Sequence, residues 1–322
     1  MPPIRHPLSD GRWHLQHGPI DLVIGADGAR EAVHAAHEAA WSRFQPLLAE
    51  LVAELPQLRR PLADDDGAPP APCPLRGSVA RRMWLACHPH RHHYITPMAA
   101  VAGAVAEEII AAYAREGIDR AWVNNGGDIA LHLAPGQALR IGLVADIARA
   151  PAARPGSATA LDGRFEVNAA LPVRGVATSG WRGRSFSLGI ADSVTVLAAT
   201  AAAADAAATM IANAVNADDE RIVRRPASAL KDDSDLGDIA VTVDVPALPL
   251  PVVQGALQAG ARRARELRAR GLIEAALLVC QGQVLAAGEL EAALPAAANA
   301  AGALSFPPLP ALVAAQAGSV FA

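Results

Sequence analysis

The first segment whose residue types could do chemistry is residues 123–129, with the sequence VNNGGDI. Three polar side chains, Asn124, Asn125 and Asp128, surround the glycines Gly126 and Gly127. Glycine tolerates positive φ, and successive backbone N–H groups in such a turn can bind an anion. The segment therefore offers a ligand-binding turn. A plain hairpin turn is the alternative interpretation, since Asn-Gly strongly favours hairpins.

A second candidate lies in residues 175–184, GVATSGWRGR. It offers hydroxyls, a glycine-framed turn, an indole ring and two guanidinium groups, on Thr178, Ser179, Gly180, Trp181, Arg182 and Arg184. Arginine binds phosphate in a bidentate manner, and tryptophan stacks on planar rings. Since no Gly-x-Ser-x-Gly elbow is present, we do not expect Ser179 to be a hydrolase nucleophile. The alternative is a surface turn with a half-buried tryptophan.

The third candidate is a carboxylate and a hydroxyl, Asp205 and Thr209, four residues apart in an alanine-rich run. On a helix this spacing puts both side chains on one face. One carboxylate and one hydroxyl suit Mg²⁺, which takes few protein ligands and completes its octahedron with water or phosphate. The alternative is an exposed aspartate, with the threonine bonding back to the helix backbone.

Two further polar runs give weaker indications. Residues 87–93, CHPHRHH, match no standard zinc spacing, and Pro89 interrupts any helix face, so we predict a polar loop. Residues 232–238, DDSDLGD, lack the spacing and closing glutamate of a calcium loop. We interpret them as a solvated turn.

Composition excludes several functions. The chain has 322 residues and a formal net charge of -4, and Lys231 is its one lysine. A Walker-type phosphate loop is excluded, a Schiff-base lysine is not expected, and no basic block predicts nucleic-acid binding. Three scattered cysteines suggest neither a disulfide scaffold nor a zinc module. With no membrane-spanning run and no leader segment evident, we expect a cytoplasmic protein that does not bind membranes.

The elements that must position these residues follow from hydrophobic spacing. Apolar residues at helical spacing predict helices over residues 28–58, 96–116, 201–215 and 252–270, with Pro46 kinking or dividing the first. Alternation predicts a hairpin over 13–26 and strands over 121–124, 129–133, 140–144, 164–177, 185–197, 240–245, 275–279 and 284–287. Residues 59–79 and 148–163 are expected to be loops, and 221–238 a polar connection.

These elements do not alternate in a βαβ rhythm. Hairpin signals instead predict a mixed or antiparallel sheet packed with helices, which is an α+β fold. We expect a single α+β domain over residues 1–290, followed by an Ala/Pro-rich tail over 291–322.

Taken in order, the three candidate segments resemble the ApbE superfamily, which contains flavin transferases that move FMN from FAD onto protein Thr or Ser residues with Mg²⁺. The segment NNGGDI resembles the family's GGD turn, ATSG at 177–180 its ATSG segment, and SVTV at 193–196 with ADAAAT at 204–209 its strand and metal motif. The chain is most similar to an uncharacterised cytoplasmic (UPF) branch, which also carries TPMAAVAG, as at 96–103.

The resemblance implies an ApbE-like fold and assigns roles to residues. Asp205 and Thr209 would hold Mg²⁺ and serve catalysis. A flavin nucleotide such as FAD would contact Asn124, Asn125, Gly126, Gly127, Asp128, Thr178, Ser179, Gly180, Trp181, Arg182 and Arg184. An acceptor protein and a homodimer are the implied partners.

The sequence also departs from the flavin transferases. They carry a Lys-Gly pair where this chain has Ala102 and Gly103, and a His-Ile-x-Asp-Pro segment where it has SLGIAD at 187–192. Two functions follow as hypotheses. One is FMN transfer or FAD pyrophosphate cleavage. The alternative is a non-transferase accessory protein that binds a flavin or metabolite, in sulfur or one-carbon metabolism.

Overall fold

The computed structural model describes residues 2–63, 72–143 and 163–288 of the chain. The described residues fall into two compact units. The first comprises the described residues within 1–139, 168–177 and 198–206, and the second those within 140–167, 178–197 and 207–288. The predicted tail over 291–322, most of the predicted loop over 148–163 and part of that over 59–79 lie outside the described residues. One domain over 1–290 stays a prediction.

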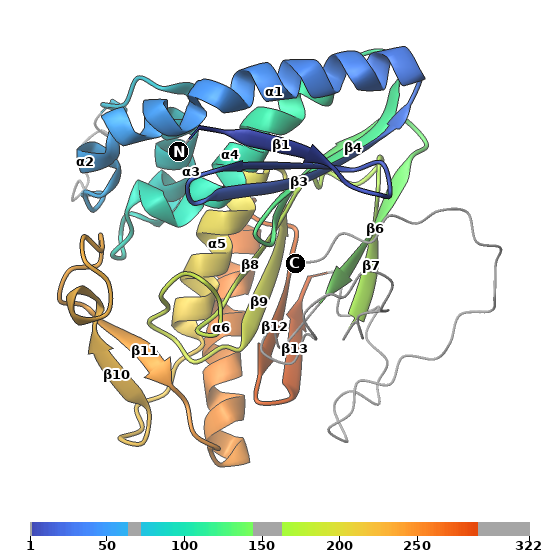
Figure 1. The fold of residues 1–322 in the computed structure, drawn as a ribbon. Coiled ribbons are helices and arrows are strands. Elements are labelled where there is room, and N and C mark those ends of the chain that lie inside the picture. Colours follow the sequence, from blue (N-terminus) through green and yellow to red (C-terminus); the bar gives the residue numbers. More distant parts are fainter. Residues whose placement is uncertain (1, 64–71, 144–162, 289–322) are drawn as a thin grey trace. The chain divides into compact units, whose positions relative to one another are not determined.

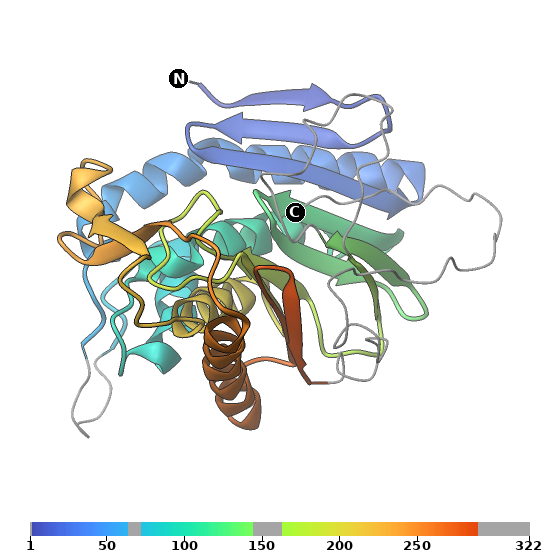
Figure 2. The same cartoon turned by 90° about the horizontal axis from the view of Figure 1, so that it is seen from below.

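An antiparallel sheet forms the frame of the first unit. Its strands are β1 (Ile4–Pro7), β2 (Trp13–His17), β3 (Ile20–Gly28), β4 (Ile118–Asn125) and β5 (Asp128–Leu133), hydrogen-bonded in that order. Figure 2 shows β1, β2 and β3, in blue, side by side. The first residues of β8 (Gly175–Ser179) pair with β5. The predicted hairpin around Gly18 is therefore confirmed as β2 and β3.

Helices cover one face of this sheet. α1 (Arg30–Ala53) packs on β2 and β3, and α4 (Val101–Ile110) packs on β4 and β5 (Figure 1). α1 and α4 also contact each other. Between the helices and the strands lie the fully buried side chains of the core, among them Leu22, Ile24, Phe44, Leu47, Ile109 and Val123.

Shorter helical segments complete the first unit. They are α2 (Leu55–Leu58), α3 (Ser78–Cys87), η1 (His88–His90), η2 (Pro97–Ala100) and η3 (Ala111–Tyr113). The first predicted helix is not divided at Pro46, which α1 contains; the break comes at Glu54, just before Pro56. A proline costs one backbone hydrogen bond within a helix, and the buried Phe44 and Leu47 beside Pro46 anchor the helix through it.

Three antiparallel strands form the sheet of the second unit. β12 (Ala275–Cys280) lies between β9 (Ser193–Ala198) and β13 (Gln283–Ala287), antiparallel to both. α6 (Leu250–Ala269) packs on β12 and β13, and β10 (Val223–Pro226) pairs with β11 (Ala240–Asp244). The chain passes from one unit to the other within five elements: β6 (Ala138–Leu143), β7 (Gly163–Asn168), β8, β9 and α5 (Ala201–Ala214). α5 has the position predicted for the alanine-rich helix.

The structure corrects several expected boundaries. The predicted strand over 164–177 is two strands, β7 (Gly163–Asn168) and β8, and that over 185–197 is strand from Ser193 onward. The strand predicted over 140–144 is β6 (Ala138–Leu143), and the predicted connection over 221–238 contains β10 and η5 (Ala227–Ala229). No helix among the described residues is both long and apolar enough to cross a membrane. The α+β prediction is confirmed.

Candidate functional site

The NGGD segment is a two-residue hairpin turn. Asn125, the last residue of β4, pairs with Asp128, the first of β5, and the turn consists of Gly126 and Gly127 at φ +65° and +116°. Both central residues of such a turn need positive φ, which explains the glycine pair. The hairpin interpretation is therefore correct for the backbone.

This turn is nevertheless buried, unlike an ordinary surface hairpin. Asn124, Asn125 and Asp128 are each less than a tenth exposed, and Asn124 Oδ1 accepts a hydrogen bond from the Gly127 N–H at 2.8 Å. Asn125 Nδ2 donates to the carbonyl of Ala102, in the first turn of α4, at 3.1 Å. The two amides thus shape the turn and attach it to the start of α4, which leaves Asp128 as its charged group.

Asp205 of α5 meets the same helix start. Its Oδ2 accepts a hydrogen bond from the backbone N–H of Gly103 at 2.9 Å. The first N–H groups of a helix have no partner within the helix, and its N-terminus carries partial positive charge. The α4 N-terminus therefore orients the Asp205 carboxylate, which sequence reasoning singled out without a partner.

At Gly103, α4 closely approaches the first turn of α5. A Cβ at this position would lie 2.3 Å from the carbonyl oxygen of Ala201 and 2.9 Å from Cβ of Asp205. Only a residue without a side chain permits this approach. Gly103 is thus required both for the helix spacing and for the hydrogen bond to Asp205.

Two carboxylates converge at this place. Burial raises the pKa of Asp205 well above its ordinary value, and the nearby Asp128 charge raises it further. The N–H groups of Gly103 and Ala102 oppose both effects without cancelling them. A divalent cation would relieve the repulsion, and carboxylate oxygens are the donors that Mg²⁺ prefers. The residues present therefore fit the metal that the sequence implied.

Thr209 lies one turn beyond Asp205 on α5, and both side chains are half-buried. Among the described residues, no three His, Cys, Asp or Glu side chains gather as a metal-binding group. Among the described residues, this place therefore offers few side-chain donors to a metal ion. That suits Mg²⁺, which keeps several waters and shares its coordination with ligand phosphates, better than a metal needing a full protein cage.

The second unit holds the ATSGWRGR segment. Thr178 and Thr195 share a hydrogen bond between their hydroxyls at 2.9 Å, which ties β8 to β9. The guanidinium of Arg182 lies 4.8 Å from the centre of the Trp181 ring, and its Nε donates to Asp192 at 3.0 Å. One face of the indole is thus covered by Arg182, whose charge already has a carboxylate partner. Ser179 is half-buried and Arg184 is exposed.

The two weaker polar runs differ in their outcome. The predicted polar loop over 87–93 is wrong, since Cys87 ends α3 and is buried, and His90 lies buried in η1. The apolar positions Val79 and Met83 precede Cys87 at helical spacing, so the residue belongs to the packed face of a helix. Within residues 232–238, Asp232 and Asp233 are exposed.

Sequence reasoning missed the residues that hydrogen-bond to Asp205 and to the start of α5, and the arginine that bonds to one of them. They are Gly103, Glu107 and Arg82, and Glu107 Oε2 accepts a hydrogen bond from the Ala202 N–H in the first turn of α5 at 3.2 Å. The available signal was two adjacent acids, Glu107 and Glu108, in an otherwise apolar helix.

Comparison with known proteins gives the family. A family model described as "AbpE bacteria" matches residues 5–286. A UPF0280 protein of Methanopyrus kandleri is 34% identical over 228 residues, which cover 69% of this chain and 83% of that protein. A UPF0280 protein of Methanothrix thermoacetophila is 36% identical over 154 residues, but the match spans 48% of this chain and 55% of that relative's length.

Two solved structures are also similar. The ApbE protein of Thermotoga maritima is 13% identical with a TM-score of 0.43, covering 90% of this chain and 98% of that one. The apo form of the Pseudomonas stutzeri flavinyl transferase ApbE is 15% identical with a TM-score of 0.41, covering 90% and 95%. The match over residues 5–286 carries the assignment, and the chain belongs to the bacterial AbpE family, as its ordered motifs predicted.

Proposed function

We propose that this chain binds FAD, or a related flavin nucleotide, together with Mg²⁺ and acts on the pyrophosphate group. Membership of the AbpE family and the ordered motifs support the flavin. The observation that carries the proposal is Asp205, whose carboxylate accepts the Gly103 N–H at the N-terminus of α4 and whose pKa is raised by the charge of Asp128. Two neighbouring carboxylates repel each other, and a bound cation relieves the repulsion.

In this proposal Asp205 and Thr209 hold the metal. When bound, Mg²⁺ neutralises charge on the pyrophosphate and so favours cleavage between its phosphorus atoms. The Gly103 N–H keeps the Asp205 carboxylate in one orientation. Asn124, Asn125, Gly126, Gly127 and Asp128 form the buried turn that faces the ligand, as the motif resemblance implies.

The motif resemblance implies further ligand contacts from residues 178–184. Thr178, Ser179 and Gly180 would bind phosphate or ribityl oxygens. Arg184, which is exposed, is the arginine better suited to a phosphate, since Arg182 already pairs with Asp192. Trp181 would offer the face that Arg182 does not cover.

The proposed reaction is transfer of FMN to an acceptor hydroxyl. The acceptor oxygen forms a bond to the phosphorus of the FMN half, and the bond from that phosphorus to the bridging oxygen breaks. AMP leaves with the bridging oxygen, and the hydroxyl proton passes to solvent. A serine or threonine of an acceptor protein gives a flavinylated product, and water gives free FMN.

Binding without transfer is the second candidate. Ala102 stands where the flavin transferases carry lysine, and residues 187–192 lack the histidine of their segment. A neutral methyl group supplies no positive charge to a leaving phosphate. The chain would then act as an accessory protein that holds the intact nucleotide.

The test uses the full chain with FAD, with and without Mg²⁺. Flavin fluorescence measures binding, and mass spectrometry separates intact FAD from FMN and AMP. We expect Mg²⁺-dependent binding that Asp205→Asn weakens at least tenfold, while Asp232→Asn in the exposed acidic turn leaves it unchanged. Release of FMN and AMP supports cleavage, and intact bound FAD supports the second candidate. No binding under either condition would overturn both.

A further inference from the structure

Helices α4 and α5 cap each other's N-termini. Asp205 on α5 accepts the N–H of Gly103 in the first turn of α4, and Glu107 on α4 accepts the N–H of Ala202 in the first turn of α5. Each helix thus supplies an anion to the unpartnered N–H groups of the other. This reciprocal arrangement fixes the two helix starts against each other, at the close approach beside Gly103.

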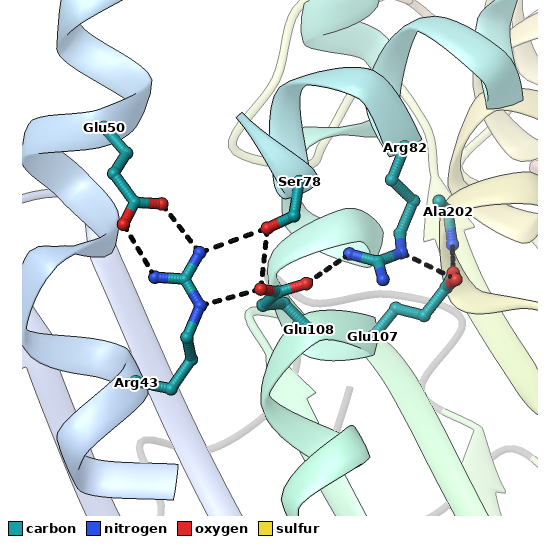
Figure 3. Close-up of polar contacts among 7 residues, drawn as sticks. All are labelled: Arg43, Glu50, Ser78, Arg82, Glu107, Glu108 and Ala202. Carbon is teal, nitrogen blue, oxygen red and sulfur yellow. Dashed lines mark hydrogen bonds and ion pairs between the residues drawn. The ribbon is translucent and has the colours of Figure 1, made fainter. Parts of the chain in front are cut away.

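Glu107 does not hold this position alone. Arg82 of α3 donates to Glu107 Oε1 at 2.8 Å and to Glu108 Oε2 at 2.6 Å, so one guanidinium clamps both neighbouring acids (Figure 3). The arginine therefore leaves the second oxygen of Glu107 directed at Ala202. Together, the bonds to Arg82 and Ala202 fix the orientation of the Glu107 side chain.

The clamp continues to α1. Arg43 and Ser78 both donate to Glu108 Oε1 at 2.7 Å, and Arg43 also forms a bidentate pair with Glu50 (Figure 3). Burial alone would raise the pKa of Glu108, but the hydrogen bonds from Arg82, Arg43 and Ser78 outweigh it and lower the pKa to about 2. The network is thus ionised at neutral pH and connects three helices, α1, α3 and α4, to the start of α5.

From this geometry we propose that Glu107, held by Arg82, is a positioning residue for the metal site. It fixes the first turn of α5, and with it the place of Asp205 one turn further along. The inference rests on the proposed function, because the group being positioned is the proposed Mg²⁺ ligand. Groups that orient metal ligands affect metal affinity without touching the ion.

The test compares Glu107→Ala, Glu107→Gln and Glu50→Ala in the full chain. Glu50 is the matched control, because it belongs to the same network but lies at its far end on α1. Two readouts are measured: affinity for Mn²⁺ as a probe ion, by electron paramagnetic resonance, and hydrogen exchange of the Gly103 amide in the metal-free protein.

We expect Glu107→Ala to weaken Mn²⁺ binding about tenfold and to speed exchange of the Gly103 amide by a similar factor. Glu107→Gln should give a smaller loss than Glu107→Ala, because its single amide oxygen can accept from Ala202 or from Arg82 but not from both. Glu50→Ala should change neither readout. If Glu107→Ala fails to fold, Glu107→Asp serves instead, since its shorter side chain withdraws the oxygen while keeping the charge.

Asp205→Asn separates failure of this inference from failure of the proposed function. If it abolishes Mn²⁺ binding while Glu107→Ala changes neither readout, the metal site stands and the positioning role is refuted. If Mn²⁺ binding does not depend on Asp205, the proposed metal site is wrong and the positioning role falls with it. Equal losses in Glu107→Ala and Glu50→Ala would also overturn the inference, since they would show general destabilisation.

Discussion

Replacing Gly103 with alanine tests the close approach of α4 and α5 directly. The added Cβ would lie 2.3 Å from the Ala201 carbonyl oxygen and 2.6 Å from its carbon, where ordinary contacts are 3.4–4 Å. Both atoms belong to helix backbone, so no side chain can turn away to make room. The two helices must therefore separate by about 1 Å, which is the difference between 2.3 Å and the 3.4 Å of ordinary contact.

The expected change in the free energy of unfolding for Gly103→Ala combines three contributions. Overpacking costs about 1–3 kcal/mol, and straining the charged hydrogen bond between the Gly103 N–H and Asp205 adds about 1 kcal/mol. Alanine returns up to about 1 kcal/mol through its higher helix propensity. We therefore expect a net loss of about 2 kcal/mol in the free energy of unfolding.

The matched control is Gly255→Ala. Gly255 lies inside α6, and a Cβ there would meet nothing within 4 Å, so the substitution should stabilise the protein by about 0.5–1 kcal/mol. Urea unfolding followed by circular dichroism measures both variants, through midpoint shifts of opposite sign. If Gly103→Ala shifts the midpoint upward as Gly255→Ala does, the tight packing of α4 on α5 is refuted.

Two further predictions concern buried titratable groups. Burial, followed by the positive charge of His34, lowers the pKa of His37 in the folded protein to about 4. Below pH 6.5 the unfolded chain therefore binds a proton at His37 that the folded chain does not bind. Stability should fall by about 1–3 kcal/mol as pH drops from 6.5 to 4, and unfolding of His37→Gln should lose that pH dependence; an unchanged dependence would contradict the assignment. Cys87 and Cys280 are buried, and burial followed by the Asp192 charge raises the pKa of Cys280 to about 12, whereas Cys73 is half-buried. Ellman's reagent should therefore modify Cys73 rapidly in the native protein and the other two only after unfolding; fast reaction of more than one thiol would count against the structure.

The elements that the sequence predicts well are those whose pattern is local. The alanine-rich α5 and the hairpin of β2 and β3 are specified by propensity and alternation within their own residues. β1 was missed, because an exposed edge strand shows no alternation and forms through backbone pairing with β2. α3 was also missed, although Val79, Met83 and Cys87 recur every fourth residue; two arginines in its first half concealed the buried face.

The candidate site likewise contains some residues that the sequence indicates and others that only the packing of the helices brings together. Asp205 could be singled out from sequence because it is the one charge in a run of alanines, and the glycine pair of the NGGD turn could be identified from its φ requirement. Its partner Gly103 is 102 positions away, and their hydrogen bond exists only once α4 and α5 pack. Glu107 and Glu108 stand out as adjacent acids in an otherwise apolar helix, but their sequence does not show that Glu107 caps the start of another helix.

The remaining question is why position 205 is an aspartate at all. A helix N-terminus needs an oxygen acceptor, and asparagine or serine serves as well as aspartate. Capping α4 therefore does not explain a second carboxylate placed near the buried Asp128, which makes the charge costly. A cation held by Asp205 and Thr209, close enough to Asp128 to offset its charge, would explain it.

In Asp205→Asn we expect changes of definite sign in two quantities, the stability without metal and the response of the melting temperature to Mg²⁺. The amide oxygen can still accept the Gly103 N–H, and the repulsion from Asp128 disappears, so without metal the variant should be at least as stable as the wild type. Adding Mg²⁺ should raise the melting temperature of the wild type by mass action and leave the variant unchanged. Thermal unfolding in EDTA and in Mg²⁺ measures both. A variant that is destabilised in EDTA, with Mg²⁺ affecting the two proteins equally, would show that Asp205 serves as a helix cap and nothing more.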